Sequence, residues 1–359
     1  MIIRHVFVIA AKCNRKLPLP KLSLGGVSPH KALPGASAVS APTYRPSAEQ
    51  FKDALEYIEC VRAQAEAYGM CCVVPPAGWS PECCVSQQLR FITELQYVHK
   101  MKQRWGPCVQ QMGLLHKHLA AENVRFEHPL VGGIELDLPA LSRAVRTCGG
   151  ISAIADDKRK WQKVADILRM PKRAQDRSFK LYEHYCKYLL SFDSLNADEK
   201  AKLESQVLAD RNRGHVDLEC VLKSKSRSLD EFFNTALNIN ARWFDKPPTP
   251  EDVEAAYWGV VEQRDEHVAV LSAHVDTKNC GGGFPTKKDS PYAKHGWNFN
   301  VLQTAESSVL KHLGLVSGVT IPELHMGMLF STNCWCSDPH GLPYISYLHT
   351  GGDIIWLVI

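Results

Sequence analysis

The residues best suited to chemistry lie near the end of the chain, in the stretch FSTNCWCSDPHGLPYISYLHTGG at 330–352. Cys336 and Asp338 are spaced i and i+2, so at a strand end their side chains would point to one face and could share a metal ion. His340 follows in the turn, and His349 lies in the next expected strand, where a packed histidine is the better interpretation. The sequence shows no base that would activate Cys336 as a nucleophile. The stretch therefore has the residue spacing of a metal site, but it does not by itself predict metal binding or catalysis.

The composition is typical of a globular protein with room for two or three compact units. The chain has 359 residues, and its 45% hydrophobic content is enough to build cores. Its thirteen cysteines are an odd number without a regular framework, which favours a reducing compartment. The doublets Cys71-Cys72 and Cys83-Cys84 lack the paired spacing of a zinc knuckle. No apolar run is long enough to predict a membrane-spanning helix.

The first 85 residues are expected to form a lead-in and a small folded segment. Residues 1–40 are rich in Pro, Ser and Gly and predict a disordered lead-in. Residues 41–85 predict a helix capped by Ser47, followed by a short strand that two prolines end. This segment is too small to bury a core alone, so we expect it to pack on another part of the chain.

Residues 86–194 predict a bundle of helices. Four apolar stripes at helical spacing mark them: Phe91, Leu95 and Val98; Leu138, Leu141, Val145 and Cys148; Trp161, Val164 and Leu168; Phe179, Tyr182, Cys186 and Leu189. The last two helices are joined across MPKR at 170–173, which is the organisation of a helix-turn-helix. Residues 195–228 read as a charged linker, helix-like up to 213, that ends in a solvated join, KSKSRS. From 229 to 359 helices are expected to give way to short β-rich segments such as HVAVLSAHV, GVTIPELHMGMLFST and YISYLHT.

Positive charge is concentrated in the helical region. Residues 89–192 contain 18 Lys or Arg and 10 Asp or Glu, a net +8, whereas the whole chain is +4, so the remainder sums to −4. A solvated basic helix face is the plain interpretation of such a pattern. Here the positive residues crowd a helical turn, which is how nucleic-acid readers present donors to a groove. The predicted DNA-binding residues are Lys158, Arg159, Lys160, Lys172, Arg173, Gln175, Arg177 and Lys180.

Three stretches in order resemble one known family. PTYRPSAEQFKDALEYIE with VVPPAGWSP resembles a JmjN segment; LVGGIELDLPALSRAV with YEHYCKYLLSFD resembles an ARID domain; HGWNFNVL with YLHTGG resembles the first part of a JmjC domain. The chain is therefore similar to the JmjN–ARID–JmjC family of Jumonji proteins. The resemblance implies a multidomain fold with an all-α ARID helical bundle, a small α/β JmjN segment and an incomplete JmjC double-stranded β-helix, or jelly roll. It also implies a fragment truncated within JmjC.

Two branches of that family share this domain order. Members of the demethylase branch carry a Cys/His-rich PHD finger between ARID and JmjC, but residues 193–228 contain only His215 and Cys220, so no finger fits. RMPKRAQDR and DPHGLPYISYLHTG are closer to the other branch, the ARID-containing accessory subunit of Polycomb repressive complex 2. The resemblance implies a nuclear, non-enzymatic repressor whose partners are double-stranded DNA, Polycomb subunits and nucleosomes. A demethylase fragment dependent on Fe(II) and 2-oxoglutarate is the alternative, and a DNA-binding module without a Polycomb link is the third.

The family's enzymatic site is degenerate in this sequence. Active members hold Fe(II) with a His, a carboxylate two residues later and a distant second His. Cys336 stands at the first His and Asp338 keeps the carboxylate, while Ser346 and Ile354 stand where demethylases of this branch carry Asn and Lys. Isoleucine cannot neutralise the cosubstrate's carboxylate, and burying that charge unpaired costs several kcal/mol. We therefore expect no catalytic residue, no bound metal and no cofactor.

The degenerate positions predict that the purified chain produces no succinate from 2-oxoglutarate with Fe(II) and methylated histone peptides. Cys336→His should not restore turnover, because the cosubstrate would still meet Ile354 in place of a lysine. Succinate measured by mass spectrometry above a reaction without protein would contradict the expectation.

Overall fold

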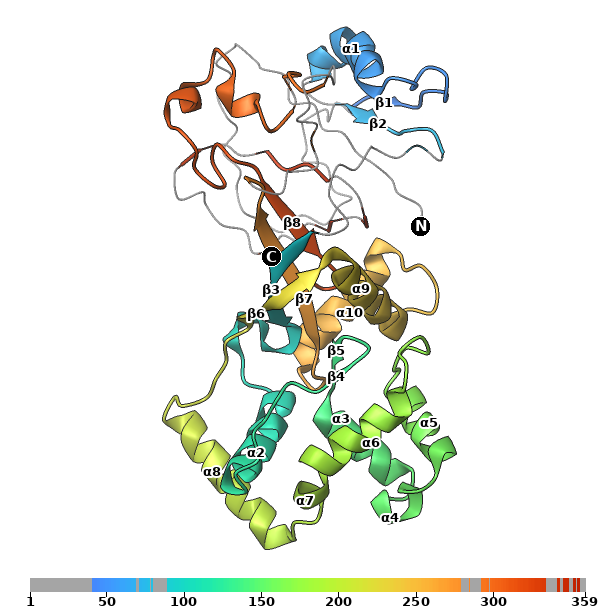
Figure 1. Ribbon diagram of the computed structural model, residues 1–359, viewed down its shortest axis with the longest axis vertical. Coiled ribbons are helices and arrows are strands. Elements are labelled where there is room, and N and C mark those ends of the chain that lie inside the picture. The colour runs from blue at the N-terminus through green and yellow to red at the C-terminus, as the bar shows by residue number, and fades with distance from the viewer. Residues whose placement is uncertain are drawn as a thin grey trace, which may run out of the picture. The chain divides into compact units, whose positions relative to one another are not determined.

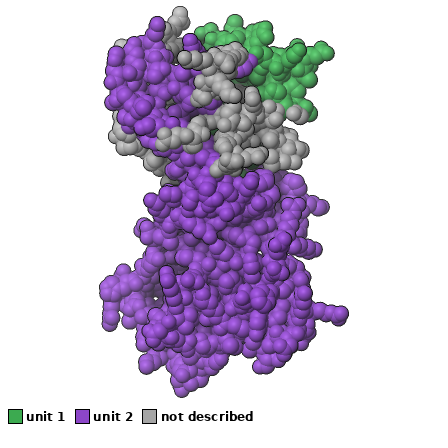
Figure 2. All heavy atoms as spheres, viewed as in Figure 1, with its two compact units in different colours: residues 1–83, 336–359 green, residues 84–335 purple. Residues whose placement is uncertain are grey.

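The computed structural model describes residues 41–68, 71–77, 79, 89–278, 284, 292–296, 298–333, 341–342, 345–348, 351–352 and 354–355. The chain divides into two compact units, one of residues 1–83 with 336–359 and one of residues 84–335 (Figure 2). Among the described residues, no helix is both long and apolar enough to cross a membrane.

The first unit contains one helix and a two-stranded parallel sheet. Its elements are β1 (Thr43–Tyr44), α1 (Ala54–Ala65), the 3-10 helix η1 (Glu66–Tyr68) and β2 (Cys72–Val73). Asp53 caps α1 by accepting from the backbone N–H groups of Leu55 and Glu56, so the prediction of Ser47 as its cap is wrong. Ser47 instead closes the preceding turn, where it accepts from the N–H of Gln50. A small core forms around Phe51, Ala65, Cys71 and Val73.

The second unit contains a helical part, from residue 107 to 212, that confirms an all-α bundle in this region. Its helices are α2 (Pro107–Ala121), α3 (Leu138–Thr147), α4 (Ile151–Ile154), α5 (Lys158–Ile167), α6 (Arg177–Tyr188), α7 (Leu190–Asp193) and α8 (Ala197–Asn212) (Figure 1). Leu138, Leu141 and Val145 on α3 and Trp161 and Val164 on α5 are buried in one core, as their helical spacing predicts.

Helix α6 buries a different face from the one expected. Its core-facing residues include Leu181, Tyr185 and Tyr188, whereas Phe179 is 61% exposed and Tyr182 is 36% exposed. Both faces of this helix carry aromatic side chains, so periodicity alone does not distinguish them. Contact with α3 and α5 decides which face is covered.

Helix α8 confirms the helix-like part of the expected linker at 195–228. Asn196 forms a capping box with Glu199 at the start of α8, which packs on α2 through the buried Val207. The stretch KSKSRS belongs to strand β6 (Val221–Ser228), not to a solvated join. Its alternation of Lys and Ser is the period of a strand, and Lys223 and Lys225 are exposed along the edge of the sheet, as suits an edge strand.

Four antiparallel strands form the sheet of this unit, in the order β6-β3-β7-β8. The other strands are β3 (Arg90–Tyr97), β7 (Ala269–Asp276) and β8 (Glu323–Gly327), and β3 leads into the 3-10 helix η2 (Val98–Gln103). The helix predicted from Phe91, Leu95 and Val98 is therefore wrong. Phe, Ile, Thr and Tyr favour a strand in this stretch, and pairing on both sides with β6 and β7 fixes it.

A buried amide holds β3 in register with its surroundings. Gln96 donates from Nε2 to Ser272 Oγ at 2.9 Å and to the carbonyl oxygen of Thr332 at 3.1 Å. Its Oε1 accepts from the Thr332 N–H at 2.7 Å. Because every polar atom of this side chain has a partner, its burial does not carry the penalty of an unsatisfied group.

Two helices, α9 (Leu229–Trp243) and α10 (Pro250–Gln263), lie beside the sheet (Figure 1). Phe232 of α9 meets Phe91 of β3 edge to face, with ring centroids 5.6 Å apart. The expectation that helices end near 229 is thus wrong, while β7 and β8 confirm the strands expected in HVAVLSAHV and GVTIPELHMGMLFST. The 3-10 helices η3 (Leu302–Thr304) and η4 (Val309–His312) lie between them in sequence. Residues 345–348 of YISYLHT are described without a strand, so no strand is found at these four positions.

The hairpin of β4 (Leu130–Val131) and β5 (Ile134–Glu135) joins the two cores of this unit. Val131 packs among the helices, and Ile134 packs in the core beside the sheet. Its turn is Gly132-Gly133, both at positive φ. A Cβ on Gly133 would collide with Thr235 Oγ1 of α9, and Asn238 Nδ2 donates to the Gly132 carbonyl at 2.8 Å. Only glycine allows α9 to approach this turn so closely.

Glu135 forms the polar centre of the same joint. It accepts from His267 Nε2 at 2.9 Å, from His128 Nδ1 at 3.1 Å and from the Tyr97 hydroxyl at 3.3 Å. Burial alone would raise the pKa of Glu135, but the hydrogen bonds from His128 and His267 lower it to about 2. A carboxylate only accepts, so both of these imidazole nitrogens donate.

We predict that Gly133→Ala destabilises the protein more than Gly214→Ala does. Both glycines have positive φ, at 83° and 71°, so each substitution costs about 1–2 kcal/mol in backbone strain. Only Gly133→Ala also overpacks the contact with Thr235, which adds about 1–3 kcal/mol, whereas the Cβ of the Gly214 variant meets no described atom within 4 Å. Urea unfolding of the two variants checks this, and equal losses of stability would contradict the close approach.

Candidate nucleic-acid interface

The predicted helix-turn-helix connection is the segment between α5 and α6. Met170, Pro171 and Ala174 are buried, and this fixes the intervening side chains outward. Lys172, Arg173 and Gln175 are all exposed. Three of the expected donors therefore share one exposed turn, held from below by apolar contacts.

Arg177 has a different place from the one expected. Its guanidinium donates to the Met170 carbonyl at 2.6 Å, to Gln162 Oε1 at 2.8 Å and to Asp166 Oδ1 at 2.7 Å. The side chain is only 11% exposed. Arg177 thus fastens the turn to α5, and its donors are already engaged within the protein. We therefore assign it to positioning the turn, not to reading a base.

A second group of predicted DNA-binding residues, Lys158, Arg159 and Lys160, forms the first turn of α5. Asp157 caps the helix by accepting from the backbone N–H groups of Arg159 and Lys160. Lys158 and Arg159 are exposed, and Lys160 Nζ donates to the Ala153 carbonyl at 2.8 Å. Cations at a helix N-terminus oppose the helix dipole. These cations therefore do not stabilise the helix, but they are well placed to attract an external phosphate.

One exposed aromatic side chain at the start of α6 was missed by sequence reasoning. Phe179, in the first turn of α6, is next to the exposed Lys180 and two residues beyond Arg177. The sequence analysis placed Phe179 in the buried apolar stripe of this helix, so its exposure was not predicted. An exposed phenyl ring can contact a thymine methyl group.

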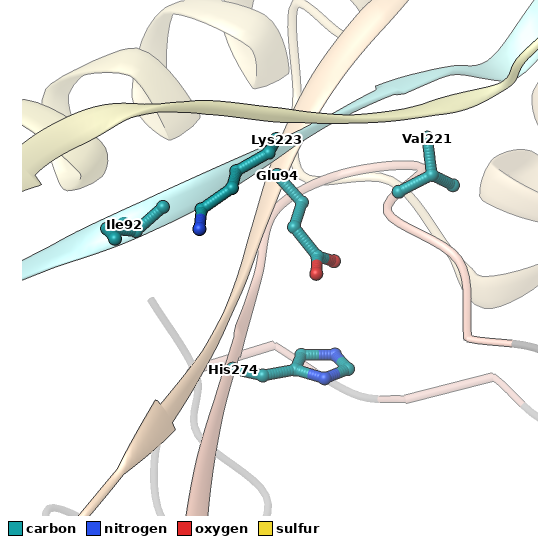
Figure 3. A pocket seen from close by; sticks show the side chains of 5 residues that line it. All are labelled: Ile92, Glu94, Val221, Lys223 and His274. Carbon is teal, nitrogen blue, oxygen red and sulfur yellow. The ribbon is translucent and has the colours of Figure 1, made fainter.

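A second feature is an open hollow on the sheet, of about 440 Å³, lined by Ile92, Glu94, Val221, Lys223 and His274 (Figure 3). Glu94 and Lys223 are partners across β3 and β6, and the Glu94 carboxylate and His274 ring point into the same space. The hollow offers one acid, one amine and one imidazole on an exposed face, which is a polar surface without an enclosed binding site.

The degenerate enzymatic positions do not form a site in the described residues. Cys336 and Asp338 lie outside them, as do His340 and His349. Ser346 and Ile354 are described, and both are exposed and outside regular secondary structure. Their predicted roles stay predictions.

Comparison with known proteins identifies two domains. A jmjN domain model matches residues 42–75, and an ARID/BRIGHT DNA binding domain model matches residues 87–193. The chain is 41% identical to "Protein Jumonji" of Gallus gallus over 89% of its own length and 32% of that protein. It is 25% identical to "Putative lysine-specific demethylase JMJ16" of Arabidopsis thaliana and 27% identical to "Lysine-specific demethylase JMJ703" of Oryza sativa subsp. japonica, over 88% of the chain in each case.

These matches define a multidomain protein that joins a jmjN domain to a DNA-binding domain of the ARID/BRIGHT class. The chain belongs to the JmjN–ARID–JmjC family. Protein Jumonji is a member of this family to which the chain is similar. It spans about a third of the length of Protein Jumonji and 23% and 21% of the two demethylases.

We predict that Arg177→Gln lowers the free energy of unfolding by about 1–3 kcal/mol, because it leaves the buried Met170 carbonyl without its charged donor. The ion pair with Asp166 adds little, since that carboxylate is 58% exposed. Arg173→Ala is the matched control, and its exposed side chain should change stability by less than about 0.5 kcal/mol. Equal effects in a urea titration would remove Arg177 from the positioning role.

Proposed function

We propose that this chain binds double-stranded DNA through the turn between α5 and α6, flanked by the first turn of α5. The supporting observation is the exposure of Lys172, Arg173 and Gln175 on one turn whose apolar residues are buried, within the ARID match. Arginine can pair bidentately with a guanine edge, and lysine mostly neutralises phosphate. Arg177 does not contact DNA in this proposal; it positions the turn by holding it against α5.

The finer proposal is a nuclear, non-enzymatic chromatin regulator that supports repression by Polycomb repressive complex 2 on nucleosomes. It rests on the likeness to Protein Jumonji and on Cys336 and Ile354, which replace residues that the family's enzymes need. Co-precipitation of the complex's subunits from nuclear extract, retained by a variant defective in DNA binding, would distinguish this role from that of a DNA-binding module alone.

A demethylase is the second candidate, favoured by the likeness to two proteins named lysine-specific demethylases. Those likenesses are 25% and 27% identical, lower than the likeness to Protein Jumonji. The succinate measurement separates the candidates, because only the enzyme consumes 2-oxoglutarate.

We predict that Lys172→Ala with Arg173→Ala weakens binding to every DNA duplex and flattens its salt dependence. The slope of log affinity against log salt should fall by about 0.9 for each phosphate that the variant no longer neutralises. Fluorescence anisotropy across a salt series should use the full chain, since strand β3 lies within 86–194 and pairs with strands outside it. Lys200→Ala with Lys202→Ala on α8 removes the same charge as a control. An unchanged slope in the turn variant would move the DNA surface elsewhere.

We predict that Phe179→Ala weakens DNA binding without changing the salt slope, because the phenyl ring carries no charge to exchange for counterions. Its side chain is 61% exposed, so the fold should be unaffected. Leu208→Ala, a similarly exposed apolar residue on α8 at 42%, is the control. Equal DNA affinity of the Phe179 and Leu208 variants in the anisotropy assay would exclude Phe179 from the interface.

A further inference from the structure

Three side chains that bind metals well meet in the joint between the helices and the sheet. They are His99 in η2, Cys108 in the first turn of α2, and His267 just before β7. Their exposed fractions are 1%, 1% and 5%, and one possible ligand atom from each lies within 4.8 Å of the others. His99 and Cys108 are nine residues apart, and His267 lies 159 residues beyond Cys108, so no short motif contains all three.

His267 is oriented as a metal ligand would be. Its Nε2 donates to the Glu135 carboxylate at 2.9 Å, which leaves Nδ1 as the free nitrogen. That Nδ1 is buried and has no hydrogen-bond partner among the described residues. Histidines that ligate metals typically donate their other ring N–H to a carboxylate, which fixes the tautomer and the ring orientation.

His99 and Cys108 complete a set of one sulfur and two nitrogens. Nδ1 of His99 lies 3.3 Å from the Val268 carbonyl oxygen and 3.1 Å from the Val268 backbone nitrogen, so Val268 can serve either tautomer. The tautomer that donates to the carbonyl leaves Nε2 as the ligating nitrogen. Cys108 has its backbone N–H fixed by the Arg264 carbonyl at 3.0 Å, which anchors the residue in this joint. A cysteine ligates as its thiolate.

A metal ion would join side chains that are packed together but not hydrogen-bonded to one another. The His99 and His267 rings lie in contact, with centroids 4.8 Å apart, and no hydrogen bond links the three side chains within the described part of the chain. Tetrahedral zinc with bonds of about 2.0–2.3 Å holds its ligands roughly 3.5 Å apart, so small side-chain rotations suffice. The Cys108 thiolate and the Glu135 carboxylate together balance the charge of a divalent ion.

We propose that His99, Cys108 and His267 bind one Zn²⁺ ion that ties α2 to the sheet, with Glu135 orienting His267 and a water in the fourth position. One thiolate and two imidazoles suit Zn²⁺ and exclude Mg²⁺ and Ca²⁺, which take oxygen ligands. The ion cross-links three separate segments of the second unit and is independent of DNA contact.

The test is the zinc content of the full chain, purified without chelator, equilibrated with Zn²⁺ and passed through gel filtration before elemental mass spectrometry. We expect about one zinc per chain. Cys108→Ala should abolish the bound zinc, and Cys71→Ala, a buried cysteine in the other unit, should retain it. Chelation should lower the unfolding temperature of the wild type and leave that of Cys108→Ala unchanged.

The absorption spectrum of bound Co²⁺ tests the ligand set in the wild-type chain itself. The wild-type chain loaded with Co²⁺ should show tetrahedral ligand-field absorption and a thiolate charge-transfer band. If Cys108→Ala does not fold, as judged by circular dichroism, Cys108→Ser preserves the side-chain size and should lose the charge-transfer band. A wild-type chain that holds no stoichiometric zinc, a Co²⁺ form without the thiolate band, or zinc retained in folded Cys108→Ala would each overturn the proposal.

Discussion

The second unit depends on one buried carboxylate. Glu135 lies at the end of the β4–β5 hairpin and gathers donors from three other segments: His128 before β4, Tyr97 at the end of β3 and His267 before β7. A buried charge without partners costs several kcal/mol, so each donor is needed to keep the carboxylate ionised. Burial first, and then the nearby negative charge of Glu135, raise the pKa of Tyr97, which keeps its hydroxyl protonated as a donor. The hydrogen bonds of this carboxylate thus link the helical part to the sheet.

The glycine turn beside Glu135 links the two parts sterically. Gly132 and Gly133 allow α9 to approach from one side and Ala174, in the turn between α5 and α6, from the other. A side chain at either position would push one of these elements away. The turn that carries Lys172 and Arg173 is therefore supported on its inner side by the hairpin and fastened to α5 by Arg177. Its exposed cations are held on a rigid base, which suits binding to a fixed pattern of phosphates.

The sheet combines a packed face with an open one. Phe91 of β3 packs against α9, while Ile92 and Glu94 line the hollow with Lys223 and His274. The lysines of edge strand β6 place positive charge where an exposed edge would otherwise invite pairing with another chain.

Local patterns of residue types were enough to predict the helices α3, α5 and α6, strands β7 and β8, and the crowding of positive charge between Lys158 and Lys180, while the domain family came from the resemblance of longer stretches to known proteins. They were not enough for 90–97 and KSKSRS, which are strands because β3 pairs with β6 and β7, more than a hundred residues away in the chain. The same holds for Arg177, which sequence spacing groups with Arg173 but whose guanidinium finds the Met170 carbonyl and Asp166. The meeting of His99 and Cys108 with His267 could not be predicted either, because His267 lies 159 residues beyond Cys108 and reaches them only when the sheet and the helices pack together.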